Sequence, residues 1–340
     1  MAKITIKKIA HDLKLAVSTV SKALSDSHEI GTDTKQRVLD YANQMNYVRN
    51  AYASSLKNSR TGNIAVVIPE VADSFFALAI NGIETIAQEK KSHVLIYLTQ
   101  ENQAKEKSIM EDFRNGRVDG ILISVAGGNT SYPHIRDLQE RNIPIVFFDR
   151  VAQGVTSPRV VTDDFESGYK ATHHLLEKGC KRIDFLSLSG NLSIIDARLE
   201  GYKKAISDRG ESASRSHAIV CTNDNVQNEN ILASLLERKE NRPDGIIASV
   251  EKLTLITYTV CTRLGISIPD EMKVVGFTSL PSAALLQPSL TTITQPAFEI
   301  GQTAAKLLFE LLEKKPKQSP NKMVLLPSLL HERGSTQMKT

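Results

Sequence analysis

A segment near the N-terminus carries side chains that suit contact with nucleic acid. Between residues 17 and 24, Val20 and Ala23 recur at the spacing of one helix face, which leaves Ser18, Ser21 and Lys22 on the opposite face. Hydroxyl groups can donate to phosphates or bases, and a lysine can donate to guanine acceptors. Short side chains would let such a helix approach base edges closely. The same pattern also fits a three-helix packing unit whose polar face is only solvated.

A second set of chemically useful side chains follows strand-like runs further along the chain. Asp73 and Phe75 come after the first run, Asp149 and Arg150 after the fourth, and Arg198 follows the first run of the second half. A ring can cover the C–H face of a sugar, while an arginine fork and a carboxylate can bind its adjacent hydroxyls. Together these residue types favour a polyhydroxylated ligand, although each one alone also fits a packing or capping role.

The elements that would position this second set form a repeated α/β pattern. Apolar strand-like runs alternate with amphipathic helical segments, and the pattern then occurs again; the runs are 64–68, 94–98, 120–124, 144–149, 182–187, 217–221, 245–248 and 273–277. This alternation predicts an α/β fold with two parallel, doubly wound sheets, one in each of two lobes. Open α/β sheets bind ligands beyond the carboxyl ends of their strands, so we expect the ligand in a cleft between the lobes.

The first 47 residues show a different pattern, that of three short amphipathic helices. Their apolar positions recur within 6–13, 17–24 and 32–45, with a tight break after the first segment, which is a helix-turn-helix in outline. Residues 1–62 carry ten Lys or Arg and five Asp or Glu, whereas the whole chain of 340 residues has a net charge of only +4. The positive charge is therefore concentrated at this end, which suggests a polyanionic partner.

Composition and motifs exclude several classes of protein. Hydrophobic residues make up 41% of the chain and charged residues 24%, as in globular proteins with a sizeable core. No apolar run reaches membrane-spanning length and no signal peptide pattern is visible, which predicts a cytoplasmic location without membrane contact. Three scattered cysteines fit a reducing compartment and argue against a metal site. Walker A, nucleophile-elbow, zinc-protease and dinucleotide-binding motifs are missing, so we expect neither an enzyme nor a cofactor.

Many stretches of the chain resemble the LacI/GalR family of transcription regulators. In the N-terminal part the matching stretches are 5–10, 17–24, 34–39, 46–47 and 50–53, and further along they include 118–122, 143–150, 274–277 and 288–293. The resemblance covers almost the entire chain. It implies a helix-turn-helix headpiece, a hinge helix, and a sensor that folds like periplasmic sugar-binding proteins with three crossovers between its lobes.

The resemblance also implies roles for individual residues. Val17, Ser18 and Lys22 would read base edges, and phosphate contacts would come from Thr5, Thr19, Ser21 and Thr34. In the hinge, Asn50, Ala53 and Leu56 match the family pattern, with Leu56 as the wedge that opens a minor-groove base step. The resemblance and the strand ends together give the expected effector contacts: Asp73, Phe75, Ser124, Asp149, Arg150, Arg198, Glu251, Thr278 and Gln295.

Several departures from the family pattern bear on these roles. Lys14 replaces the usual glycine of the turn, Ala16 replaces the serine that caps the second helix, and Lys22 replaces the commoner arginine. The missing cap should cost about 1 kcal/mol. In the pocket, Thr278 replaces an aspartate and Val250-Glu251 replaces an Asn-Asp pair. These pocket changes leave three possibilities open: a neutral sugar, an anionic ligand such as a sugar acid or sugar phosphate, or a site that no longer senses a small molecule.

The predicted organisation has three parts. They are a headpiece (1–48), a hinge (49–62) and a two-lobed effector-binding and dimerisation domain (63–340), with lobe one at about 63–162 and 291–325 and lobe two at about 163–290 and 326–340. The expected function is repression by a homodimer whose affinity for double-stranded operator DNA is switched by a small carbohydrate-like effector. The alternative is a DNA-binding regulator whose sensor is only a dimerisation scaffold or binds a non-sugar anionic metabolite.

Overall fold

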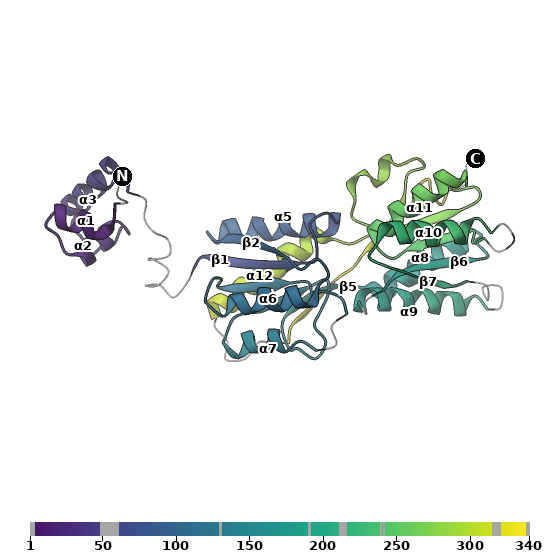
Figure 1. Ribbon diagram of the computed structural model, residues 1–340, viewed down its shortest axis with the longest axis horizontal. Coiled ribbons are helices and arrows are strands. Elements are labelled where there is room, and N and C mark those ends of the chain that lie inside the picture. Colours follow the sequence, from purple (N-terminus) through teal and green to yellow (C-terminus); the bar gives the residue numbers. More distant parts are fainter. Residues whose placement is uncertain are drawn as a thin grey trace. The chain divides into compact units, whose positions relative to one another are not determined.

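The computed structural model describes residues 4–47, 61–128, 131–189, 192–210, 216–238, 240, 242–314 and 321–337. The chain divides into two compact units, Met1–Thr61 and Gly62–Thr340 (Figure 1). The predicted hinge contacts Asn50, Ala53 and Leu56 lie outside the described residues.

The first unit contains the three predicted helices. They are α1 (Ile6–Asp12), α2 (Val17–Ala23) and α3 (Thr32–Gln44). One buried side of each helix contributes to a small common core, whose fully buried members are Ile9, Ala10, Val20, Ala23, Val38 and Ala42. Three of these six side chains are alanines, so the apolar surface that holds the unit together is limited.

The turn between α1 and α2 has two unfavourable local features. Lys14 adopts φ 54°, in the left-handed region that favours glycine. Ala16 stands at the N-cap of α2 and provides no side-chain hydrogen bond, so the predicted loss of a cap is confirmed. By contrast, the Oγ1 of Thr5 caps α1 by accepting a hydrogen bond from the backbone nitrogen of Lys8 at 3.3 Å.

The second unit is a pair of lobes, each built on a six-stranded sheet. The sheet of lobe one has the order β11-β5-β4-β3-β1-β2, and its strands pair in parallel. Its strands are β1 (Asn63–Ile68), β2 (His93–Leu98), β3 (Gly120–Ile123), β4 (Ile145–Phe148), β5 (Arg159–Thr162) and β11 (Met323–Leu326). Its helices are α5 (Ser74–Glu89), α6 (Gln103–Phe113), α7 (Pro133–Glu140) and α12 (Ala297–Lys314).

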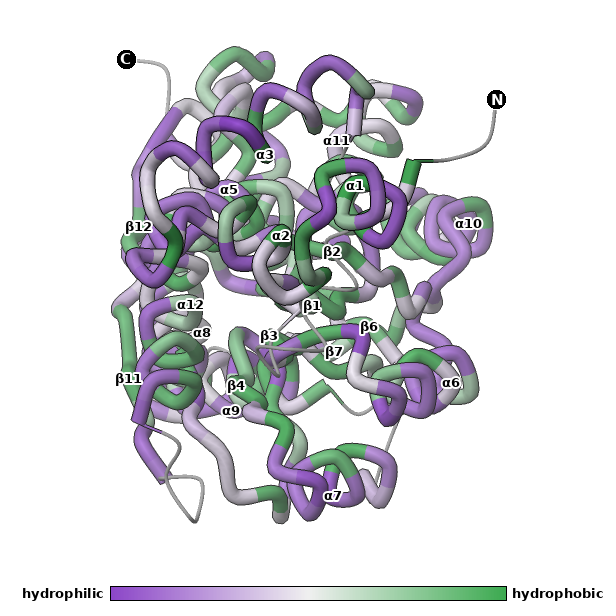
Figure 2. The backbone as a smooth tube through the Cα atoms, turned by 90° about the vertical axis from the view of Figure 1, so that its left-hand side faces the viewer, coloured by the Kyte–Doolittle hydropathy of each residue, from purple (hydrophilic) through white to green (hydrophobic). Residues whose placement is uncertain are grey.

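Different helices cover the two faces of this sheet. Ile64 and Val66 of β1 pack in a cluster with α5 and α12, whereas the alternating residues Ala65 and Val67 pack with α6 and α7. Helices α6 and α7 carry both hydrophobic and hydrophilic segments in Figure 2, as expected for helices with one buried face. The predicted doubly wound α/β architecture is therefore confirmed.

Lobe two repeats this architecture. Its sheet has the order β12-β10-β9-β8-β6-β7, and only β12, which pairs with β10, runs antiparallel among the described strands. The strands are β6 (Ile183–Leu188), β7 (Ala218–Cys221), β8 (Gly245–Ala248), β9 (Lys273–Phe277), β10 (Thr291–Thr294) and β12 (Leu329–His331). The helices are α8 (Asp164–Glu177), α9 (Ser193–Asp208), α10 (Asn225–Leu236), α11 (Glu251–Leu264) and the 3-10 helix η3 (Pro281–Leu285).

Three connections join the lobes, after β5, after β10 and after β11. The second connection differs from the sequence prediction, which placed all of 291–325 in lobe one. Thr291 and Ile293 pair in parallel with β9, so β10 belongs to lobe two, and the chain returns to lobe one with the following helix α12, which packs in the core of that lobe. Gln295, the residue after β10, consequently lies at a crossover between the lobes.

Candidate functional site

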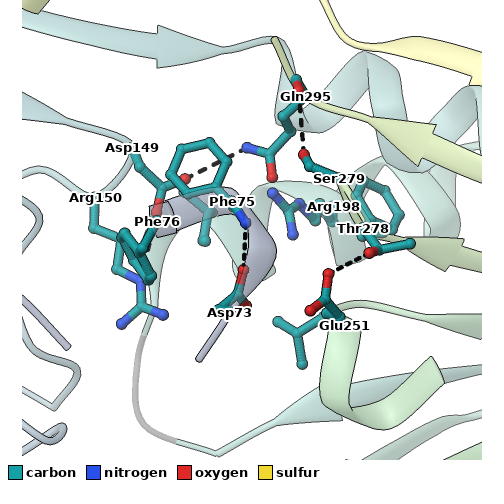
Figure 3. Close-up of a pocket in the computed structure, with 13 residues that line it drawn as sticks. Asp73, Phe75, Phe76, Asp149, Arg150, Arg198, Glu251, Thr278, Ser279 and Gln295 are labelled. Atoms are coloured by element: carbon teal, nitrogen blue, oxygen red, sulfur yellow. Dashed lines mark hydrogen bonds and ion pairs between the residues drawn. The ribbon is translucent and has the colours of Figure 1, made fainter. Parts of the chain in front are cut away.

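A pocket that is partly open to solvent lies between the two lobes, with about 370 Å³ of empty space when the open solvent at its mouth is included. Lobe one contributes residues from the start of α5 and the end of β4, and lobe two contributes residues from α9, the start of α11 and the end of β9. Figure 3 shows these side chains converging from both lobes. The lining residues are Asp73, Phe75, Phe76, Asp149, Arg150, Ile194, Arg198, Val250, Glu251, Phe277, Thr278, Ser279 and Gln295.

Eight of the nine predicted effector residues line this pocket. The ninth, Ser124, is fully buried behind it, where its hydroxyl donates to Asp149 Oδ2 at 3.4 Å. Sequence reasoning did not select five lining residues, and four of them are direct neighbours of selected ones: Phe76, Val250, Phe277 and Ser279. Their position next to strand ends was the available signal. Ile194, on α9, carried no such signal.

Arg198 is held tightly within lobe two. Its Nε donates to Asp164 Oδ1 at 2.7 Å, its Nη1 donates to the carbonyl of Ser249 at 2.7 Å, and its guanidinium lies 4.3 Å from the ring centroid of Phe277. The helix that carries it packs closely, because a Cβ on Gly168 would lie 2.0 Å from the carbonyl oxygen of Arg198. The remaining nitrogen, Nη2, is buried without a hydrogen-bond partner and belongs to a residue that lines the pocket.

Arg150 is held in a comparable way within lobe one. Its Nη1 donates to Glu101 Oε1 at 2.6 Å, and its guanidinium lies 5.8 Å from the ring centroid of Phe76. Its Nε makes no hydrogen bond and is 3.7 Å from Asp149 Oδ2. Each arginine therefore has a carboxylate partner in its own lobe and at least one nitrogen that makes no hydrogen bond.

Three carboxyl groups line the same pocket. Burial raises the pKa of Asp73 to about 6, and the nearby charge of Glu251 adds to the increase. Burial also raises the pKa of Asp149, against the opposing effect of the charges on Arg150 and Arg198. Each arginine also has a carboxylate partner outside this trio, Glu101 or Asp164, so acidic groups outnumber basic groups around the pocket. Such a pocket favours hydroxyl donors and disfavours an anion.

Gln295 joins the lobes next to a crossover. Its Nε2 donates to Thr162 Oγ1 at 3.2 Å and to Asp149 Oδ1 at 3.4 Å, and its backbone carbonyl oxygen accepts from the hydroxyl of Ser279 at 3.2 Å. These bonds are long, so Asp149 keeps acceptor capacity for a ligand hydroxyl. The arrangement can therefore bind a compact polyhydroxylated molecule, because both lobes contribute hydrogen-bond donors and acceptors to the pocket.

The predicted nucleic-acid contacts gather around α2 in the headpiece. Val17 and Ser18 are exposed, and Val17 keeps 43% of its surface accessible. Thr19 and Ser21 are half-buried on the same helix, as is Thr34 on α3, while Thr5 is exposed at the cap of α1. The side chains thus leave a small, polar and accessible helix face.

Lys22 is engaged within the headpiece. Its Nζ forms an ion pair with Glu29, and 37% of its side chain is accessible. Contact with a base edge would require this lysine to leave Glu29, an exchange that is inexpensive at an exposed site.

The sequence predicts neither a metal site nor a membrane-spanning helix. In the part of the chain that the structure describes, no group of three or more His, Cys, Asp or Glu residues is arranged to hold a metal ion. Within the same residues, no helix combines the length and the apolar character that a membrane span requires. Cys180, Cys221 and Cys261 are free and buried.

Comparison with known families covers both units. Residues 61–327 match the family described as periplasmic binding proteins and sugar binding domain of LacI family. Residues 5–50 match the family described as bacterial regulatory proteins, lacI family. The two matches together span the headpiece and both lobes.

Individual relatives align over nearly the whole chain or the whole sensor. Catabolite control protein A of Priestia megaterium is 27% identical over 98% of this chain and 99% of its own length. A LacI family transcriptional regulator from Enterococcus faecium, solved with bound ribose, is 27% identical with a TM-score of 0.71 and covers 80% of this chain and 98% of its own. The lac repressor dimer bound to operator and an anti-inducer has a TM-score of 0.82 at 18% identity, covering 98% of this chain and 99% of its own, which supports the shared fold.

Proposed function

The chain belongs to the LacI family of bacterial regulatory proteins, and from this membership we propose that a small effector, bound between its lobes, switches its affinity for operator DNA. The chain is thus a transcription regulator and not an enzyme. We expect it to act in the cytoplasm, where regulators of this kind meet DNA.

One observation carries the effector part of the proposal. Arg198 Nη2 is a buried donor without a partner, and Arg198 is one of eight predicted residues that line the pocket. A buried donor that stays unsatisfied is unfavourable, so a ligand acceptor at this nitrogen would be stabilising. The same pocket offers Phe75 as an apolar wall and Asp149 as an acceptor.

The pocket supports a neutral, compact sugar over an anionic one. Both arginines have carboxylate partners in their own lobes, and three further carboxyl groups face the ligand space. A sugar phosphate would meet more negative than positive charge there. The relative from Enterococcus faecium contains ribose, which agrees in size and charge with this expectation. Glu251 and Thr278 belong to the proposed effector contacts together with Asp73, Arg150 and Gln295.

The DNA-binding part of the proposal rests on the headpiece. Exposed Val17 and Ser18, with Lys22, would read base edges, and the phosphate contacts would come from Thr5, Thr19, Ser21 and Thr34. Asn50, Ala53 and Leu56 remain proposed hinge contacts, with Leu56 as a minor-groove wedge. We expect a homodimer, because one small headpiece binds modestly while two linked headpieces gain affinity on a palindromic site.

The first test is a thermal-shift screen of the full-length protein against neutral monosaccharides, sugar acids and sugar phosphates. A ligand at 100 times its Kd stabilises the protein by about 2.7 kcal/mol. We expect hits among the neutral sugars. A response to sugar phosphates alone would contradict the charge argument, and no response from any class would favour a sensor that is only a dimerisation scaffold.

The second test links the pocket to DNA. An operator is selected from a random palindromic library, and its affinity is measured with and without the saturating hit. Coupling between the two sites should change the affinity about 5- to 150-fold. An unchanged affinity at saturation would rule out the switch.

A pair of variants tests whether the hit occupies this pocket. Phe75→Leu removes a ring from the pocket wall and should weaken ligand binding about fivefold. Phe113→Leu removes a ring from the buried core of lobe one, outside the lining, and should leave ligand affinity unchanged. Equal affinities for both variants would place the ligand elsewhere.

A further inference from the structure

Glu251 receives hydrogen bonds from both lobes at once. It is the first residue of α11 in lobe two, and only 8% of its surface is exposed. Its Oε1 accepts from the backbone nitrogen of Ser74 at 3.2 Å, and its Oε2 accepts from the hydroxyls of Ser74 and Thr278. Ser74 begins α5 of lobe one, whereas Thr278 follows β9 of lobe two. The carboxylate therefore connects the two lobes directly.

This connection differs from the other contacts between the lobes. The cross-lobe bonds of Gln295 go to Thr162 and Asp149, and both Gln295 and Thr162 adjoin crossovers where the chain itself keeps the lobes together. Ser74 and Glu251 are 177 residues apart, and neither adjoins a crossover. In Figure 3, Gln295 and Glu251 lie at opposite ends of the group of side chains. A relative movement of the lobes about their connections would therefore separate Ser74 from Glu251 while it strains the Gln295 contacts less.

The bonds of Glu251 belong to a strong class. Hydrogen bonds to an ionised carboxylate are about twice as strong as those between neutral groups. One donor is the backbone N–H of Ser74, the first residue of the 16-residue helix α5. The first N–H groups of a helix have no partner within the helix, and a negative charge is favourable at this end. The hydroxyl of Thr278, from the same lobe as Glu251, holds the carboxylate in place.

We propose that Glu251 is a latch that holds the lobes of this sensor closed without an effector. The inference rests on the proposed function, in which the angle between the lobes is the signal. With the latch intact, the effector-free protein already populates the closed arrangement, and an effector adds to a closure that has partly occurred. Thr278 and Glu251, two of the departures from the family pattern, are then partners in one device.

The latch can be measured as a distance between the lobes. Val71→Cys in lobe one and Val226→Cys in lobe two introduce accessible thiols at positions that are 45% and 69% exposed, whereas the native cysteines are at most 5% exposed. Spin labels on this pair, in full-length protein diluted with unlabelled protein, report the separation of the lobes. We expect one short distance without effector and a majority of longer distances after Glu251→Gln.

Two further variants complete the design. Ser74→Ala removes the hydroxyl on the opposite lobe and should lengthen the distance in the same direction as Glu251→Gln. Glu299→Gln changes an exposed acid in the first turn of α12 and should keep the short distance. As a second readout, hydrogen exchange at the start of α5 should accelerate about tenfold in Glu251→Gln, the factor for one lost charge-assisted bond.

The outcomes separate the latch from the effector switch. A long distance in the unaltered effector-free protein, or a short one in both Glu251→Gln and Ser74→Ala, would overturn the latch. Neither result depends on operator affinity. Conversely, an operator affinity that ignores a bound effector would overturn the switch, even if the distances behave as a latch predicts.

Discussion

The headpiece and the sensor hold their polar side chains in different ways. Val17 and Ser18 are exposed in the first turn of α2, and this helix lacks a side-chain cap. In the sensor, Arg198 is held by an ion pair, a carbonyl and an aromatic ring. A change in the headpiece should therefore act locally and cost little, whereas a change in the pocket affects folding as well as binding.

Arg198→Ala should give the largest effect. It leaves the carboxylate of Asp164, which is 8% exposed, without its charge partner. Breaking a buried pair in this way costs about 3–5 kcal/mol. Urea-induced unfolding of the sensor measures the loss in the free energy of unfolding. Arg114→Ala is the control, since it breaks a pair with Asp137 whose side chains are 40% and 30% exposed, and it should cost less than about 1 kcal/mol. A cost below about 1 kcal/mol for Arg198→Ala would show that the pocket is as tolerant as the headpiece.

Asp73→Asn should change how stability depends on pH. The folded pKa of Asp73, about 6, lies above its unfolded value, so its contribution to stability is complete below about pH 4 and disappears as pH rises through about 6. Asparagine does not titrate and still caps α5. Relative to the unaltered protein, the variant should gain on the order of 2 kcal/mol between pH 4 and pH 7. Asp224→Asn, at the exposed cap of α10, controls for the change of capping residue. Parallel stability curves for Asp73→Asn and the unaltered protein would contradict the prediction.

The sequence predicted elements with strong periodicity and missed those defined by partners far along the chain. The predicted strands 245–248 and 273–277 coincide with β8 and β9. Four short strands were not recognised: β5, β10, β11 and β12. Each is three or four residues long, and each adjoins a crossover and belongs to the two outermost strands on one side of its sheet. Such pairing depends on the assembled sheet, which explains why the boundary near residue 291 was misplaced.

The pocket was predictable for a related reason. The carboxyl ends of parallel strands meet at one edge of a sheet, so the residues after each run were bound to converge. What the residue types could not indicate was which side chains were already engaged. Arg198 and Glu251 both appeared as ligand contacts, yet most of their hydrogen-bonding groups are used within the protein. Ser124 proved to be a support for Asp149.

Ala16→Ser tests the headpiece with a substitution that should increase its stability. A serine at this N-cap could accept from the free backbone nitrogens of Ser18 or Thr19, and it should stabilise the headpiece by about 1 kcal/mol. Thermal unfolding of the headpiece, or hydrogen exchange across α2, measures the gain. Ala16→Val is the matched control, because valine cannot cap a helix. Equal stabilities of the two variants would mean that the first turn of α2 is already satisfied.

Lys14→Gly should give the smallest gain, because two effects oppose each other. At φ 54° the lysine bears a left-handed cost of about 1–2 kcal/mol, which glycine avoids. Glycine also gives the unfolded chain more freedom, which removes about 0.5–1 kcal/mol of that benefit. The net stabilisation should therefore be about 0.5 kcal/mol, measured by headpiece unfolding. Arg37→Gly, on the exposed face of α3, has no such strain to relieve and should lose about 1 kcal/mol. A gain in stability for Lys14→Gly together with a loss for Arg37→Gly would identify the turn as strained. A loss of stability in both variants would show that Lys14 fits its turn without strain.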